Sequence, residues 1–102
     1  MKKLTLEQIR ELQKEYGVSE IQIIINSGLA WTLEGSMGRT AMSTLESGAC
    51  MLPEVPRKDY YGSIVPARTN LKAGTKGTLE LSQEFWQKVV DGEIELNRPD
   101  ED

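Results

Sequence analysis

The sequence predicts a mainly α-helical fold, a single small domain of four or five helices with one long, ordered but irregular connection. Three observations favour this class. Four windows combine a helix-capping residue with apolar residues at helical spacing. Glycine and proline interrupt every window between residues 51 and 77, which therefore form the connection. The 102 residues, 38% of them apolar, are enough for one modest core, so we expect a globular domain over residues 1–97 and a flexible acidic tail at 98–102.

The first helix is expected over residues 6–16. Thr5 and Gln8 have the spacing of a capping box, in which each side chain bonds the backbone N–H of the other residue. Apolar residues follow at positions i, i+3 and i+7, and Gly17 is placed to end the helix.

The second helix is expected over residues 20–26, with Ser19 as its cap and Gly28 beyond its end. Its three isoleucines also fit a β-strand, because β-branched residues favour strands. We prefer a helix because both ends carry capping signals and no second strand is in view to pair with it. A short helical piece is expected next, over residues 29–34.

The stretch from Gly35 to Pro53 gives the clearest helix, around which the rest of the chain is organised. Ser36 is placed to cap this helix and Gly48 to end it. Its apolar stripe consists of Ala41, Met42, Leu45 and Ala49.

The connection from residue 51 to residue 77 is long for a compact domain, and such segments are uncommon unless they are functional or disordered. We expect it to be ordered and functional, because it holds apolar residues that can anchor it to a core. A short helix over residues 67–72 is the one regular element expected within it. The apolar anchors are Tyr60, Tyr61, Ile64, Val65 and Leu71.

The last helix is expected over residues 78–91, with Gly92 after its end. Glu84 and Lys88 have the i, i+4 spacing of a helical ion pair. Its apolar side consists of Leu79, Phe85, Trp86, Val89 and Val90.

The composition argues against most enzyme chemistry. The chain has no histidine and a single cysteine, Cys50, so the common general bases, thiol dyads and transition-metal sites are nearly excluded. We therefore expect no enzymatic activity, no metal and no cofactor, and a buried structural role for Cys50. The lone thiol, the lack of a bilayer-length apolar run and the lack of a signal peptide predict a cytoplasmic location with no membrane partner.

The charge distribution points to an anion site. The net charge is −4, which argues against nucleic acid, yet residues 57–76 hold five basic residues and one acidic residue, Asp59. Two segments with glycines, hydroxyls and one cation each, at residues 35–40 and 74–78, lie where helices begin, and the first N–H groups of a helix favour a phosphate or carboxylate. The candidate ligand-binding residues are Ser36, Gly38, Arg39, Arg57, Tyr60, Arg68, Thr75, Lys76 and Thr78.

Three segments carry a resemblance in style and length: Gly35-Ser36-Met37-Gly38-Arg39, Ser47 to Pro53, and Asp59-Tyr60-Tyr61-Gly62. With them the chain resembles small proteins encoded by bacterial phages and prophages. The resemblance brings no assigned activity. It implies a class of roles in a bacterial host cell, either binding a host protein or sequestering a host signalling nucleotide.

We therefore predict a non-enzymatic binding protein, expected to be a homo-oligomer, that holds an anionic, phosphate-containing small ligand such as a host signalling nucleotide. The first alternative is a protein-interaction module in which the connection and an apolar helix face contact a host protein. The second is DNA binding, because residues 12–28 resemble a helix-turn-helix motif. Its would-be recognition helix offers Glu20, Gln22 and Asn26 but no arginine or lysine for phosphates.

Overall fold

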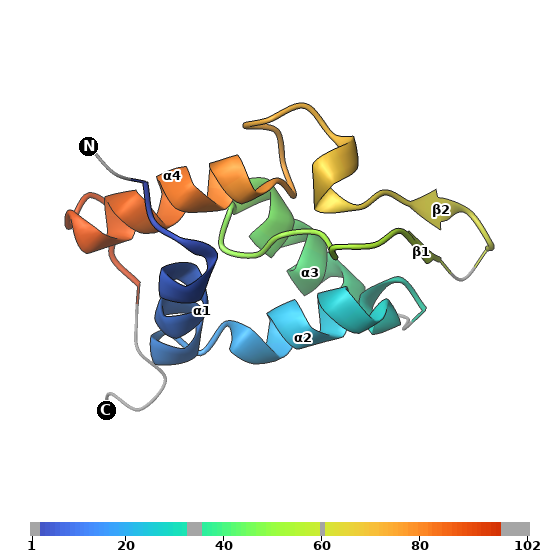
Figure 1. Ribbon diagram of the computed structural model, residues 1–102. Coiled ribbons are helices and arrows are strands. Elements are labelled where there is room, and N and C mark those ends of the chain that lie inside the picture. The colour runs from blue at the N-terminus through green and yellow to red at the C-terminus, as the bar shows by residue number, and fades with distance from the viewer. Residues whose placement is uncertain (1–2, 33–35, 60, 97–102) are drawn as a thin grey trace.

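The computed structural model describes residues 3–32, 36–59 and 61–96, except for the side chains of residues 36 and 37. The described part is mainly helical, as predicted (Figure 1). Helix α1 packs on α4, α2 packs on α3, and a small hairpin extends away from the helices. The elements in order are α1 (Leu6–Glu15), α2 (Ser19–Ser27), η1 (Leu29–Trp31), α3 (Ser36–Ser47), β1 (Arg57–Lys58), β2 (Ile64–Val65), η2 (Arg68–Asn70) and α4 (Leu79–Val90).

The capping box at the start of α1 is confirmed. The Gln8 backbone N–H donates to Thr5 Oγ1 at 3.1 Å, and the Thr5 N–H donates to Gln8 Oε1 at 2.8 Å. These bonds satisfy two of the N–H groups that a helix start leaves free. Ile9 then lies on the inner face of the helix and is fully buried.

The start of α2 differs from the prediction. Its N-cap is Val18, which already has helical backbone angles and makes no side-chain capping bond. The left-handed turn at Gly17 lets the Val18 N–H donate to the Gln13 carbonyl at 2.7 Å, so the helix begins one residue early. The predicted cap at Ser19 is therefore wrong, whereas the stop at Gly28 is confirmed by its left-handed φ of 85°.

Helix α3 ends at Ser47, and Gly48 follows with a φ of 101°, as the sequence predicts. An added Cβ at Gly48 would lie 2.8 Å from the Leu81 carbonyl oxygen, so glycine also permits the close approach of α4. The predicted stripe holds only in part: Ala41 is buried, Met42 is 39% exposed, and Ala49 lies beyond the helix.

The described residues of the connection contain a small hairpin and one 3-10 turn. Strands β1 and β2 pair antiparallel, with Arg57 opposite Val65 and Lys58 opposite Ile64. The helix expected over residues 67–72 is only the single 3-10 turn η2.

Helix α4 is the last helix of the described chain, and it forms close to the predicted range. Thr78 caps it by accepting from the Leu81 N–H, and Lys88 Nζ lies 3.6 Å from Glu84 Oε1. Trp86 is fully buried, whereas Val90, expected on the apolar side, is 55% exposed. The predicted tail at 98–102 lies outside the described residues.

Residues 48–53, the central segment, run through the middle of the molecule between α4 on one side and α2 on the other (Figure 1). Their side chains alternate between two core clusters. Cys50 and Leu52 join a cluster with residues of α2, η1 and α3. Ala49 and Met51 join a second cluster with residues of α1 and α4.

Side chains, together with backbone groups of Thr44, Arg68 and Gly77, satisfy the buried backbone of the central segment. Gln22 accepts from the Met51 N–H at 2.8 Å and donates to the Met51 carbonyl at 2.8 Å. Gln13 and Trp86 both donate to the Ala49 carbonyl, at 2.9 Å and 3.1 Å. Buried peptide groups are costly when unpaired, so these side chains are what lets irregular backbone occupy the core.

Candidate functional site

A hollow of about 670 Å³ lies where η1, α3, the hairpin and residues 71–77 meet. Buried residues from the core form part of its lining, and more exposed apolar residues from α3 and the hairpin form the rest. A mainly apolar concavity with a few polar groups is typical of a small-ligand site. Its lining consists of Ala30, Trp31, Gly38, Arg39, Met42, Leu45, Leu52, Asp59, Tyr61, Ile64, Val65, Pro66, Leu71, Lys76 and Gly77.

Trp31, a lining residue of the hollow, has a buried polar atom without a hydrogen-bond partner among the described residues. Its side chain packs against the core cluster of α2 and α3 while also lining the hollow. The indole Nε1 atom is buried, and the structure gives it no acceptor among the residues described. A buried donor without an acceptor costs about 1–3 kcal/mol and calls for an explanation in a native protein.

Two cations and one carboxylate line the same hollow. Arg39 comes from α3 and Lys76 from the turn before α4, and both are exposed. The Asp59 carboxylate accepts from the backbone N–H groups of Tyr61 and Ser63, each at 2.9 Å, so it organises the hairpin turn. The formal charge of the lining is thus positive.

The nine predicted site residues do not lie together in the structure. Gly38, Arg39 and Lys76 line the hollow together, although they belong to the two separate glycine-containing segments. Arg57 and Arg68 instead line a smaller depression with Arg10, described below. The side chain of Ser36 and all of Tyr60 lie outside the described residues.

The two threonines of the predicted site form the turn that precedes α4. Thr78 is 1% exposed, and its Oγ1 accepts from the Gly74 and Leu81 N–H groups while donating to the Thr75 carbonyl at 2.6 Å. Thr75 Oγ1 donates to the Lys72 carbonyl at 2.6 Å. Both hydroxyls are therefore engaged within this turn, which carries Lys76 to the hollow.

Sequence reasoning missed the apolar part of the hollow. Trp31, Met42, Leu52 and Leu71 come from four different segments, and none of them was a predicted site residue. The available signal was the connection itself, since a long irregular segment with apolar anchors often covers a site. Which side chains it covers depends on tertiary contacts.

In the helix-turn-helix alternative, the recognition helix would be α2. One of the side chains expected to contact DNA bases, Gln22, is instead bonded inside the protein. Gln22 is 6% exposed and bonds the central segment. Among the residues described, no group of three or more Cys, Asp or Glu side chains is arranged to hold a metal ion. In the same part of the chain, no helix has the length and apolar character that crossing a bilayer requires.

The chain was also compared with known proteins. No protein-family model, curated protein or solved structure matches it. The hollow and the groups that line it are therefore the basis for a functional proposal.

Proposed function

We propose that the protein is a non-enzymatic binding protein whose hollow takes a small anion with an apolar ring system. The mainly apolar lining of the hollow, with the cations Arg39 and Lys76 on it, carries this proposal. The buried Trp31 N–H, which has no acceptor among the described residues, would gain one only if the indole turned toward a bound ligand. A nucleotide has the required chemistry, since its base is flat and rich in acceptors and its phosphates are anionic.

The remaining lining fits the same kind of ligand. Leu45 and Leu52 offer apolar surface for a ring, and burying such surface contributes about 25 cal/mol per Å². Arg39 and Lys76 are positioned for an anionic group, each contributing about 0.2–1 kcal/mol at an exposed site. Affinity would therefore come mainly from the apolar lining, and charge selectivity from the two cations.

A fluorescent aromatic sulfonate, anilinonaphthalene sulfonate, combines an apolar body with an anionic group and serves as the probe. We expect saturable binding to the native protein, weakened roughly fivefold in the double variant Arg39→Gln/Lys76→Gln, the equivalent of about 1 kcal/mol. The uncharged probe phenylnaphthylamine should bind wild type and double variant alike. Equal weakening of both probes would contradict the role given to the cations.

A second pair of variants tests whether the probe occupies the hollow. Met42→Glu places a charge in the lining of the hollow, whereas Ile23→Glu places one on exposed α2 surface outside it. Both positions are exposed, so both variants should fold, as circular dichroism will check. Binding that survives Met42→Glu as well as it survives Ile23→Glu would refute the hollow as the site.

A second candidate function is protein interaction, in which a partner's apolar segment fills the hollow. The exposed apolar side chains of the hairpin favour it: Tyr61 is 87% and Ile64 70% exposed, and both line the hollow. Salt separates the two functions, because binding of an anion weakens as ionic strength rises and an apolar interface does not. Native mass spectrometry of protein purified gently from its host would reveal a retained ligand, and also the homo-oligomer that we propose.

A further inference from the structure

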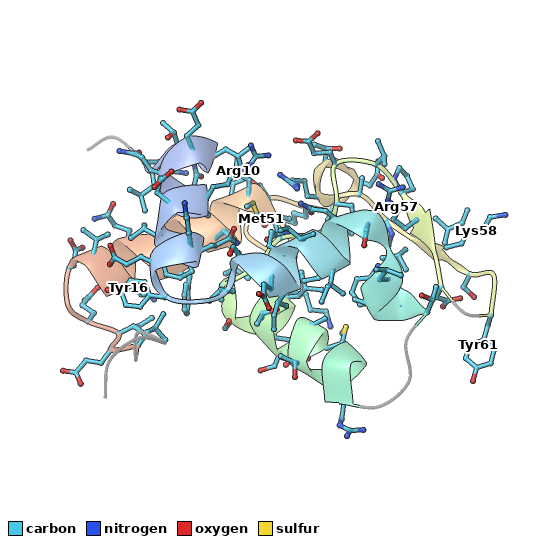
Figure 2. The ribbon with its side chains drawn as sticks, turned by 90° about the horizontal axis from the view of Figure 1, so that it is seen from below. Arg10, Tyr16, Met51, Arg57, Lys58 and Tyr61 are labelled. Atoms are coloured by element: carbon cyan, nitrogen blue, oxygen red, sulfur yellow. The ribbon has the colours of Figure 1, made fainter. Side chains whose placement is uncertain are left out.

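A small depression of about 210 Å³ gathers three arginines from distant parts of the chain. Arg10 comes from α1, Arg57 from β1 and Arg68 from η2. In Figure 2 Arg10 and Arg57 both lie in the upper part of the view, and Tyr61 lies lower, further along the hairpin. The other lining residues are Asn26, Glu54 and Val55.

Arg68 is the fixed member of this cluster. It is 8% exposed, its Nε donates to the Leu52 carbonyl at 2.7 Å, and its backbone N–H donates to the Pro53 carbonyl at 2.9 Å. The guanidinium is therefore held against the central segment. Its two Nη atoms find no hydrogen-bond acceptor within the described ranges, and a guanidinium has five N–H donors in all.

The positive charge of the depression is not neutralised by close ion pairs. Glu54 is the sole carboxylate in the lining, and no carboxylate oxygen of the described chain lies within 4.0 Å of a nitrogen of the three arginines. Arg57 Nε donates instead to the Asn26 carbonyl at 3.0 Å. Burial lowers the pKa of Arg68; the charge of Glu54 raises it and that of Arg10 lowers it further, so both charges act on Arg68.

We propose that this depression is a binding site for a phosphate-type oxyanion, separate from the hollow. Guanidinium groups match tetrahedral oxyanions because their planar N–H donors bond two oxygens at once. Arg68 provides donors already held in place, so less side-chain entropy is lost when an anion binds. Arg10 and Arg57 supply further charge, and the anion offsets the repulsion between Arg10 and Arg68.

The test uses inorganic phosphate and methyl phosphate as probes, with the arginine Nε–Hε signals observed by NMR at low ionic strength. We expect both probes to shift these signals saturably, and the double variant Arg10→Gln/Arg57→Gln to weaken binding at least tenfold. Both residues are exposed, so this variant should fold. Tighter binding of methyl phosphate would identify an esterified phosphate as the natural group, and tighter binding of inorganic phosphate the free anion.

Two controls make the outcome decisive. Lys14→Gln removes a cation from the same helix as Arg10 but outside the depression and should leave phosphate binding unchanged. Arg39→Gln/Lys76→Gln, which weakens the probe in the hollow, should also leave it unchanged. Lack of saturable binding by wild type, or equal weakening by the controls, would overturn the oxyanion site without affecting the proposed function of the hollow.

Discussion

The central segment and the β1–β2 hairpin are both non-helical, yet they lie in opposite environments. Residues 48–53 are all buried, whereas the described hairpin residues are mostly exposed. In the hairpin, the Asp59 N–H donates to the Ser63 carbonyl at 2.9 Å and the turn is closed locally. In the central segment, the side-chain partners come from α1, α2, η2 and α4, and backbone partners come from Thr44 and Gly77.

This difference shows two ways of ordering irregular backbone. A short exposed hairpin needs few partners, because water hydrates the peptide groups that its two-residue strands leave unpaired. A buried segment has no such recourse, so helices on both sides supply amide, indole, hydroxyl and guanidinium groups. The order of the central segment therefore depends on particular polar side chains, and that of the hairpin much less so.

We expect the largest loss of stability from a substitution of Gln22, which removes its hydrogen bonds to the central segment. In Gln22→Leu, the Met51 N–H and carbonyl lose their partner, and Gln13 loses an acceptor. Each buried group left unpaired costs about 1–3 kcal/mol, so we expect a loss of about 4 kcal/mol in the free energy of unfolding. Urea denaturation followed by circular dichroism measures it.

The matched control for Gln22→Leu is Gln87→Leu. Gln87 also bonds through its side chain, to Asp91 at 3.0 Å, but at an exposed position. We expect a change within about 0.5 kcal/mol. Similar losses for both variants would show that burial of the bonded groups is not what matters.

The second prediction compares two glycines with nearly the same backbone angle. Gly77 has a φ of 88° and an added Cβ would lie 2.7 Å from Leu52 Cγ, whereas Gly62, at the hairpin tip, has a φ of 82° and open space around it. Gly62→Ala should lower the free energy of unfolding by only about 1 kcal/mol, the cost of a left-handed backbone conformation for alanine. Gly77→Ala should lose about 3 kcal/mol, because overpacking at the central segment adds to that term. Thermal unfolding of both variants measures the difference. Equal losses of stability in the two variants would contradict the prediction.

The third prediction measures how well the central segment is isolated from water. Burial raises the pKa of the Cys50 thiol from 9.0 to about 11, with the Thr44 hydroxyl partly opposing the shift. The unfolded chain therefore loses this proton at lower pH than the folded one, so stability is retained below about pH 9 and lost as pH rises toward 11. We expect the free energy of unfolding to fall by about 2 kcal/mol between about pH 8 and about pH 10.5 because of this thiol.

The control for this pH dependence is Cys50→Ala, because lysines and tyrosines titrate in the same range. The variant is less stable overall, but the difference between wild type and variant should shrink by about 2 kcal/mol across the range. A constant difference would mean that the thiol reaches water in the folded protein. Slow reaction of wild type with a thiol reagent at about pH 8 would agree with burial.

The sequence alone determined the helices and most of their ends. The capping box of Thr5 and Gln8 and the stops at Gly28 and Gly48 are signals that act within one or two helical turns, so they could be found without the fold. The start of α2 escaped prediction because the turn at Gly17, rather than a side chain at Ser19, sets it.

Only the tertiary structure decided what the polar side chains do. A glutamine that bonds a core peptide and one that bonds water look alike in sequence, and Gln22 finds Met51 across 29 positions of the chain. For the same reason, the predicted cations divided in space: Arg39 and Lys76 line the hollow, and Arg57 and Arg68 the depression. Local patterns fix backbone geometry over a few residues, but a site is made by packing between segments that no local pattern relates.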